Sequence, residues 1–116
     1  MIDRKEVIRD YKARIPEKGI FVIRNVTNNK VFLGSTLSIY GKFNRERFTL
    51  NLGTHQNAEL QKDWKAFGED KFSFEVLETL KLKDEPGYNY EEDLQILEMI
   101  WIEKYRPFEK NCYNTN

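Results

Sequence analysis

Apolar positions near the start of the chain predict a short N-terminal helix. Val7, Tyr11 and Ile15 recur at helical spacing. Pro16 then stops the pattern, because the residue before a proline disfavours helical geometry. We therefore expect a helical extension over residues 1–17.

Two apolar segments around an asparagine turn predict a β-hairpin. Residues 20–23 are apolar on both faces, which is typical of a central strand, and residues 31–33 repeat this pattern. The Thr-Asn-Asn-Lys sequence at residues 27–30 suits a turn, since asparagine tolerates positive φ. We expect this hairpin to lie in the core.

The middle of the chain predicts two helices of different quality. Residues 34–49 are ambiguous, because Gly41 weakens a helix by about 1 kcal/mol relative to alanine. We expect a short or irregular helix there. Residues 57–67 predict a regular helix. Its apolar stripe consists of Leu60, Trp64 and Phe67.

The last third of the chain predicts a third strand and a last helix. Apolar and polar residues alternate over residues 71–80, as in a half-buried strand. After a break at Pro86, residues 89–105 predict a helix. Its apolar stripe consists of Leu94, Leu97, Trp101 and Tyr105.

Glu98 projects into the apolar stripe of this last helix, only about 40° from Leu94 at 100° per residue. Burying a carboxylate costs several kcal/mol unless a cation, hydrogen-bond donors or a metal ion compensates. Two interpretations stay open. Glu98 forms an ion pair with a lysine or arginine at the core edge, or it is a metal ligand or catalytic carboxylate.

Composition restricts the class of protein. The chain has 116 residues, 40% of them hydrophobic and 33% charged, which fits one globular domain. It has no long apolar run for a membrane span, and its charged start lacks the apolar segment of a secretory signal. The single cysteine, Cys112, cannot form an internal disulfide and fits a reducing compartment. We expect a cytoplasmic protein without a membrane partner.

The charge balance argues against a strong, stand-alone DNA-binding protein. Lysine and arginine number 19, and aspartate and glutamate also number 19. A chain without net charge has no overall positive field to attract phosphates. Locally, "GKFNRERF" is basic and "KDEPGYNYEED" is acidic, and either run is most simply a solvated face.

Several segments, taken in order, resemble the GIY-YIG nuclease family. Gly-Ile-Phe at residues 19–21 stands where the family has Gly-Ile-Tyr, and Phe-Leu-Gly at residues 32–34 stands where it has Tyr-Ile-Gly. Downstream, "GTHQNAELQKDWKAFGEDKFSFEVLE", "LEMIWIEKY" and the closing "CYN" are similar to the later segments of the family. The resemblance covers residues 19–114.

The resemblance implies an α/β fold of the α+β kind, in which helices flank a central three-stranded antiparallel sheet. Residues 1–116 would form a single domain, with residues 1–17 as the helical extension and residues 19–114 as the core. The implied activity is phosphodiester hydrolysis of nucleic acid, DNA rather than RNA, with one divalent metal ion, Mg²⁺ or Mn²⁺.

The resemblance also assigns roles to particular residues. Glu98 matches the metal-binding glutamate, and His55 matches a histidine of some members, although a lone loop histidine is more often incidental. Asn114 matches a terminal asparagine that braces the site. Gly19 and Gly34 are the glycines of the two motifs.

Four positions depart from the family pattern. Phe21 and Phe32 lack the hydroxyl groups of the two tyrosines, so they can neither donate nor accept a proton. Lys42 stands where an arginine is expected and lacks its bidentate fork. Glu46 replaces a histidine and puts a negative charge where a phosphate would approach.

A substitute cation is available nearby: Arg45 or Arg47 would replace the arginine if Gly41 shifts the helix register. The candidate catalytic residues are Lys42, Arg45, His55 and Glu98. Three functions stay open. The domain has kept its fold and a nucleic-acid or metal contact but lost efficient cleavage, or it is an active metal-dependent endonuclease with a rearranged site. Alternatively it is a protein-interaction or small-ligand module, with a protein partner or a second copy.

Overall fold

Three strands form one antiparallel sheet. Strand β1 is Gly19–Asn25, β2 is Val31–Thr36 and β3 is Phe72–Thr79. Their order is β2-β1-β3, so β1 is the central strand, as its two apolar faces predict. In the turn between β1 and β2, Asn29 has a φ of 62°, a conformation that asparagine adopts more readily than most residues. The predicted hairpin is confirmed.

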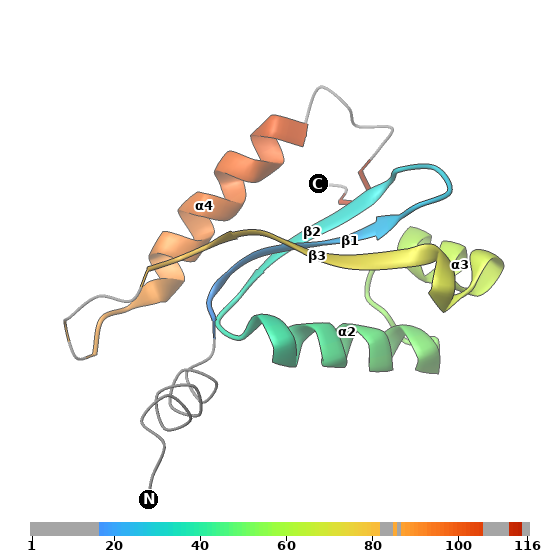
Figure 1. Cartoon of the computed structure of the whole chain (residues 1–116), viewed down its shortest axis with the longest axis horizontal. Helices are drawn as coiled ribbons and strands as arrows, with labels where there is room; N and C mark the ends of the chain where they lie inside the picture. The colour runs from blue at the N-terminus through green and yellow to red at the C-terminus, as the bar shows by residue number, and fades with distance from the viewer. Residues whose placement is uncertain (1–16, 82–84, 86, 106–111, 115–116) are drawn as a thin grey trace, which may run out of the picture.

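Helices cover both faces of this sheet in the computed structural model (Figure 1). Helices α2 (Ile39–Leu52) and α3 (Ala58–Phe67) lie on one side, with a short 3₁₀ turn, η1 (Glu69–Lys71), leading into β3. Helix α4 (Tyr90–Tyr105) lies on the other side. The predicted α+β fold, with helices flanking a three-stranded antiparallel sheet, is confirmed.

The structure describes residues 17–81, 85, 87–105 and 112–114. The N-terminal helix predicted for residues 1–17 therefore lies outside the described residues, apart from its last position. The division of the chain into this extension and a core stays a prediction.

Two apolar clusters hold the helices to the sheet, one on each face. Under α4 the buried residues come from alternate positions of β1 and β2: Ile20, Val22, Val31 and Leu33. The predicted stripe of α4 packs here, with Leu97 and Trp101 against this cluster. On the opposite face, the buried residues come from β1, β3, α2, α3 and the C-terminal segment: Phe21, Ile23, Leu50, Leu60, Trp64, Phe72 and Tyr113.

The prediction of a short or irregular helix over residues 34–49 is wrong, because α2 is a regular helix of 14 residues. Gly41 lies in its first turn, where fewer helical hydrogen bonds depend on it. Ile39 and Leu50 are fully or almost fully buried, at 0% and 1% exposure. Burial of such side chains contributes about 2 kcal/mol each, which outweighs the cost of one glycine.

The end of the described chain returns to the sheet beside β2. Cys112 pairs in parallel with Val31, and the Tyr113 N–H donates to the Val31 carbonyl at 2.7 Å. This segment covers part of the edge of β2, which would otherwise present unpaired backbone groups. It also carries Tyr113 into the buried cluster on the face of the sheet where α2 and α3 lie, and it brings Asn114 to the backbone of Leu33 in β2.

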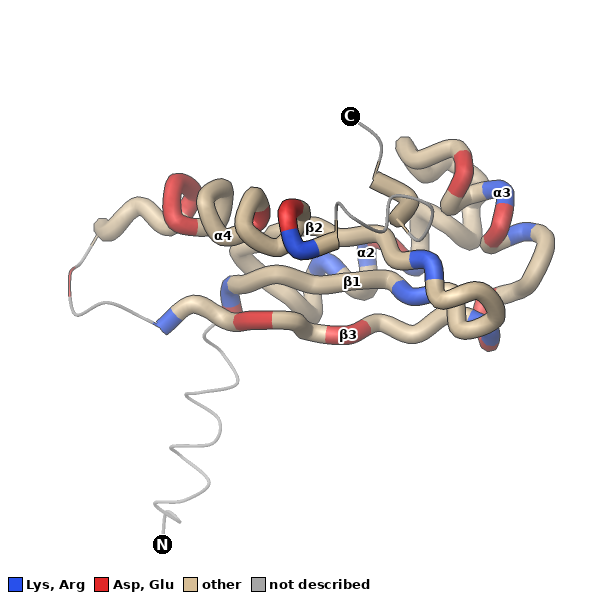
Figure 2. Tube along the Cα trace, turned by 90° about the horizontal axis from the view of Figure 1, so that it is seen from above, with Lys and Arg blue, Asp and Glu red and all other residues tan. Residues whose placement is uncertain are grey.

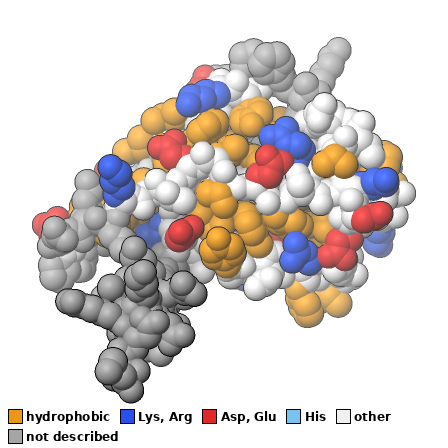
Figure 3. Space-filling model, viewed as in Figure 1, with side chains coloured by type: hydrophobic (Ala, Val, Ile, Leu, Met, Phe, Trp, Pro, Cys, Tyr) orange, Lys and Arg blue, Asp and Glu red, His pale blue; other side chains and the backbone are white. Residues whose placement is uncertain are grey.

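The surface has no single sign of charge. Acidic and basic residues are interspersed over the helices and strands (Figure 2). Apolar side chains also reach the surface over α4 and around β3 (Figure 3), and the exposed residues on these elements include Ile96, Met99, Ile100 and Val76. Among the described residues, no helix combines the length and apolar character that crossing a membrane requires.

Candidate functional site

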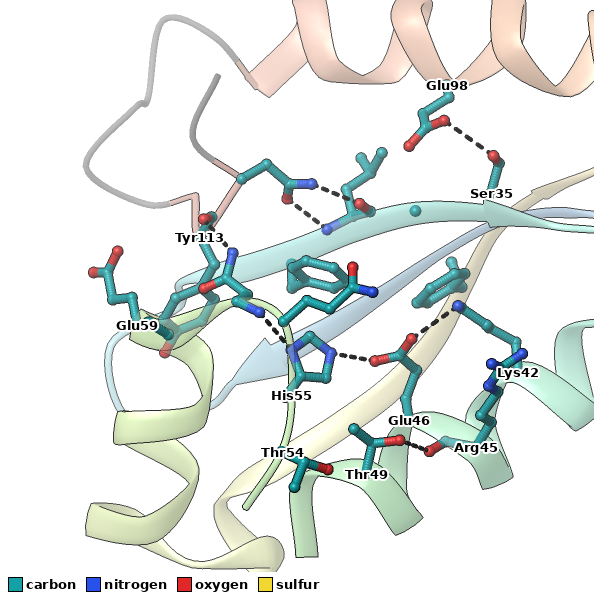
Figure 4. A pocket seen from close by; sticks show the side chains of 18 residues that line it. Ser35, Lys42, Arg45, Glu46, Thr49, Thr54, His55, Glu59, Glu98 and Tyr113 are labelled. Carbon is teal, nitrogen blue, oxygen red and sulfur yellow. Dashed lines mark hydrogen bonds and ion pairs between the residues drawn. The ribbon is translucent and has the colours of Figure 1, made fainter. Parts of the chain in front are cut away.

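An open pocket of about 1020 Å³ lies between β2, α2, the loop that joins α2 to α3, and the C-terminal segment (Figure 4). It collects nearly all of the residues that the motifs single out: Phe21, Phe32, Gly34, Lys42, Arg45, His55, Glu98 and Asn114. Gly19 is not among the residues that line it. Residues up to 93 positions apart in the sequence thus meet in one place.

The floor of the pocket is apolar. Phe21 is fully buried, and its ring centroid lies 6.5 Å from that of Phe32 and 5.9 Å from that of Phe43. Gly34 makes room for the Phe21 ring, since a Cβ at this position would approach Phe21 Cζ to 2.8 Å. The two rings fill the floor but offer no hydroxyl to a water molecule or a phosphate.

Gly19 has a packing role at a distance from the pocket. A Cβ added there would lie only 2.1 Å from the Glu78 carbonyl oxygen. The glycine therefore allows β1 and β3 to approach each other where their pairing register shifts, between Ile20 and Phe21. Its contribution to the pocket is indirect, through the position of β1.

On the α2 side of the pocket, Glu46 joins Lys42 to His55. One carboxylate oxygen of Glu46 lies 2.9 Å from Lys42 Nζ, and the other accepts a hydrogen bond from His55 Nε2. Glu46 is only 7% exposed. Burial raises the pKa of Glu46, but the hydrogen bonds from His55 and Lys42 outweigh burial, and the net pKa lies below its usual value. Glu46 is therefore a buried, charged carboxylate.

His55 is held rigidly by its neighbours. Its Nδ1 accepts a hydrogen bond from the Asn57 backbone N–H at 3.0 Å, and the His55 backbone N–H donates to Gln61 Oε1 at 2.9 Å. Its ring meets that of Phe32 edge to face, with centroids 5.3 Å apart. Because Nδ1 accepts, the ring proton lies on Nε2 and points at Glu46. With a side chain only 5% exposed, His55 is not the incidental surface histidine that its loop position suggested.

Arg45 and Arg47 point to different places. Arg45 is exposed, lines the pocket and forms no ion pair within the described part of the chain. Arg47 Nε lies 3.1 Å from Glu69 Oε1, and Arg47 Cζ lies 4.6 Å from the Phe74 ring centroid. Arg47 does not line the pocket. Because α2 is regular, the register shift that would exchange these residues does not occur.

Glu98 reaches the pocket from α4, on the side opposite Glu46 (Figure 4). Its Oε2 accepts a hydrogen bond from the Ser35 hydroxyl at 3.0 Å. Across the described residues, no lysine or arginine forms an ion pair with Glu98, so the ion-pair interpretation finds no support. Glu98 lies at the edge of the apolar stripe instead, half-buried and facing the pocket.

Glu98 fits a metal ion as a single protein ligand. Mg²⁺ is often held by one or two carboxylates, with water and substrate phosphate oxygens completing its octahedral shell. Glu98 supplies one carboxylate, which is the smaller of these two numbers. The part of the chain that the structure describes contains no group of three His, Cys, Asp or Glu side chains that could hold a metal ion by itself.

Asn114 clamps the C-terminal segment onto β2. Its side-chain oxygen accepts a hydrogen bond from the Leu33 N–H, and its amide nitrogen donates to the Leu33 carbonyl, both at 2.7 Å. The side chain thus imitates the backbone of a neighbouring strand. The Asn57 amide donates to the Tyr113 carbonyl at 2.8 Å, which ties the His55 loop to the same segment.

Tyr113 anchors this segment in the core. Its hydroxyl donates to Asp63 on α3 at 2.6 Å and accepts from Asn25 at 3.1 Å. Burial and the Asp63 carboxylate raise the pKa of Tyr113 to about 12. The tyrosine hydroxyl at the pocket is therefore a structural group that is bonded on both sides, and not a replacement for the hydroxyls missing from the floor.

Sequence reasoning placed Glu46 in the site but missed its bond to His55. It also missed Asn57 and Tyr113. An N-cap asparagine ahead of the regular helix over residues 57–67 was the signal for Asn57, and the closing "CYN" contained Tyr113 beside Asn114. Neither signal indicates which distant residue the side chain will meet.

Comparison with known proteins places this arrangement among nucleases. No family model matches the sequence. Over 99 residues the chain is 32% identical to intron-associated endonuclease 1 of Enterobacteria phage T4. The match covers 84% of this chain and 36% of the relative, so the chain spans about a third of the length of the curated relative that it matches.

Two solved structures share the fold over nearly their full length. The catalytic domain of the intron endonuclease I-TevI, in a mutant form, has a TM-score of 0.70 and 28% identity, covering 84% of this chain and 92% of that one. The catalytic domain of the homing endonuclease I-TevI has a TM-score of 0.69 and 27% identity, covering 85% and 98%.

The fold, the order of the motifs and these similarities define a nuclease-type α+β domain. The chain belongs to the GIY-YIG nuclease family. It is a divergent member, in which Phe21 and Phe32 replace the two motif tyrosines and Lys42 replaces the arginine.

Proposed function

We propose that this domain binds nucleic acid, DNA rather than RNA, and hydrolyses phosphodiester bonds weakly or not at all. The observation that carries this proposal is the apolar floor of the pocket. Phe21 and Phe32 fill the two tyrosine positions without offering a hydroxyl. Removal of one donor to the transition state typically slows a reaction by about 10²- to 10³-fold, and this domain has lost more than one.

The α2 side of the pocket supports the same proposal. Lys42 supplies a cation and His55 a ring donor at the pocket, and both are bonded to Glu46. In this arrangement neither nitrogen of His55 is free to accept a proton, because Nδ1 accepts from Asn57 and Nε2 donates to Glu46. Among the described residues, the α2 side of the pocket therefore offers neither a general base nor a free cation and ring donor to bind a phosphate.

Nucleic-acid binding would depend mainly on Arg45. This side chain is exposed at the pocket and is not neutralised by a carboxylate of the described chain. With a net charge of zero, the domain has no overall field to add to this contact. We therefore expect modest affinity that falls as salt increases, with the shallow slope of a contact that releases few counterions.

Glu98 would hold one Mg²⁺ or Mn²⁺ ion in this proposal. A divalent ion at this position supplies positive charge to a phosphate oxygen of the bound nucleic acid. Ser35 orients the carboxylate toward the pocket through its hydroxyl.

A second candidate function is an active, metal-dependent endonuclease with a rearranged site. The observation in its favour is that Arg45 and Glu98 both face the pocket without an ion-pair partner among the described residues. Lys42 and His55 would complete the set if Glu46 released them.

We further propose a cytoplasmic location, and a protein partner or homodimer to supply specificity.

The testing experiment measures binding and cleavage together. Short labelled single- and double-stranded DNA and RNA are incubated with the protein and Mg²⁺ or Mn²⁺, at low and at physiological salt. We expect binding to DNA without efficient cleavage. Cleavage that Glu98→Gln abolishes, while Glu92→Gln on the same helix leaves it intact, would establish the active endonuclease instead.

Arg45→Ala tests the binding surface, with Lys62→Ala as its control. Lys62 is exposed on α3 and does not line the pocket, so both substitutions remove one positive charge. We expect Arg45→Ala to weaken DNA binding about 3- to 10-fold and to lower the salt dependence by about one released counterion. Equal effects of the two substitutions would contradict a DNA contact centred on the pocket. If the domain binds no DNA at all, the protein-interaction module is the function that stays open.

A further inference from the structure

Glu46 takes up the hydrogen bonds of two donors that converge on one point of the pocket. Lys42 lies one turn earlier on α2, and its Nζ is 2.9 Å from Glu46 Oε1. His55 comes from the loop after α2, and its Nε2 donates to Glu46 Oε2. Figure 4 shows the carboxylate between the two donors. Each oxygen of one small anion thus has a donor of its own.

The His55 donor is fixed independently of Glu46. The Asn57 N–H sets the tautomer of the ring, and the Phe32 ring packs against it edge to face. Gln61, buried on α3, holds the His55 backbone and itself donates to the Leu50 carbonyl at 3.0 Å. These contacts do not involve Glu46, so removal of the carboxylate would leave Nε2–H pointing into the pocket. A preorganised donor of this kind binds an anion without further ordering.

The position is also open to an incoming ligand. Lys42, Glu46 and His55 all line the pocket, and Arg45 lines it as well. Lys42 is about one-third exposed along its side chain, whereas Glu46 and His55 are almost fully buried. A ligand therefore approaches from the Lys42 side, and the carboxylate stands between it and His55.

We propose that Lys42 and His55 form a binding site for one tetrahedral oxyanion, the phosphate group of a nucleic acid, and that the Glu46 carboxylate occupies this site as an internal substitute. In the native protein the phosphate position is filled by the protein itself. Nucleic acid then binds at the rim, through Arg45, without a phosphate between the two donors. This inference deepens the proposed function, because it names the phosphate contact that the native domain withholds.

Charge-assisted hydrogen bonds from an ammonium and a ring N–H are short and strong, and a carboxylate and a phosphate compete for them on similar terms. An internal carboxylate has the advantage, since it loses no translational freedom on binding. Glu46→Ala removes this competitor. Glu46→Gln is the matched control, because its amide keeps the shape but can accept from only one of the two donors.

The experiment is a titration with inorganic phosphate at constant ionic strength, followed by the backbone amide and His55 ring resonances. We expect Glu46→Ala to bind phosphate at least about tenfold more tightly than the native protein, with shifts centred on Lys42 and His55. Glu46→Gln should gain less. A dinucleotide in a parallel titration distinguishes free phosphate from a phosphodiester as the preferred ligand.

Two double variants make the result specific. In Glu46→Ala with Lys42→Ala, and in Glu46→Ala with His55→Ala, the gain should disappear. No gain in Glu46→Ala, or a gain that persists without either donor, would overturn the proposal. If Glu46→Ala does not fold, the native protein decides the matter: a saturable phosphate-dependent shift at its own Lys42 and His55 would show that the site is not internally filled.

This test is separate from that of the proposed function. Phosphate binding by Glu46→Ala requires only the two donors, whereas DNA binding by the native domain depends on Arg45. A domain that binds no DNA yet gains phosphate affinity on loss of Glu46 would retain this inference and lose the proposed function. A domain that binds DNA but gains no phosphate affinity on loss of Glu46 would retain the proposed function and lose this inference.

Discussion

The two sides of the pocket use similar residue types in different ways. On the α2 side, Lys42, Glu46 and His55 are bonded to one another, and the chemistry that they offer is consumed within the protein. On the opposite side, Glu98 receives a single hydroxyl hydrogen bond from Ser35 and faces the pocket. The comparison teaches that a side chain at a motif position can act on a ligand only if its polar atoms are not already bonded within the protein.

The same contrast separates stability from function. Glu46 and His55 on the α2 side are almost fully buried, so their partners matter to the folded state. Glu98 is half-buried and has one modest partner, so its loss should hardly affect folding. Substitutions on the two sides should therefore differ in their effect on unfolding.

The largest difference is expected between His55→Ala and Glu98→Ala. Loss of His55 removes one of the two donors of a buried carboxylate and leaves the Asn57 N–H without its acceptor. We expect it to lower the free energy of unfolding by about 3 kcal/mol. Glu98→Ala should lower it by less than about 1 kcal/mol. Urea unfolding of the two variants measures both, and equal losses would contradict the contrast.

A smaller effect is expected from Asn114→Ala, which releases the clamp that holds the C-terminal segment on β2. It removes two hydrogen bonds to the Leu33 backbone, a residue that is 1% exposed. We expect a loss of about 2 kcal/mol in the free energy of unfolding. Asn44→Ala on the exposed face of α2 is the matched control and should change stability by no more than about 0.5 kcal/mol. Similar losses would show that the clamp does not hold the segment.

The smallest effect concerns acid. The pKa of Glu46 in the folded protein lies below its ordinary value of 4.5, because the donors outweigh burial. A carboxyl whose pKa is lowered by folding stabilises the protein above the unfolded pKa, and this contribution is lost as the pH falls through the folded pKa. The difference in unfolding free energy between the native protein and Glu46→Gln should therefore shrink below pH 4.5. Denaturation at several pH values measures it, and a difference that grows in acid would refute the assignment.

Much of the fold is predictable because its strands carry clear patterns. Residues of β1 are apolar on both faces, and only a central strand buries both. Helix α2 is harder to predict. Its exposed face carries apolar residues, and its buried face carries Glu46, so the usual stripe is obscured. The exposed apolar residues of this helix are Tyr40, Phe48 and Leu52.

The site is predictable in its members but not in its bonds. The ordered motifs bring Lys42, His55 and Glu98 into one candidate set, and all three line the pocket. The hydrogen bond between His55 and Glu46 depends on how the loop after α2 folds back, which a local pattern does not encode. Phe21 and Phe32 show the same limit: their identity reveals the missing hydroxyls, but only the structure shows that the Tyr113 hydroxyl is held by Asp63 and Asn25.

The most direct test of the account is a comparison of cleavage rates with enzyme in excess over one labelled DNA. The native domain is compared with a variant that restores the family residues at the four divergent positions: Phe21→Tyr, Phe32→Tyr, Lys42→Arg and Glu46→His. The account predicts almost no cleavage by the native domain and a gain of at least about 10²-fold in the variant, at similar DNA affinity. Efficient cleavage by the native domain that Glu98→Gln abolishes would contradict it.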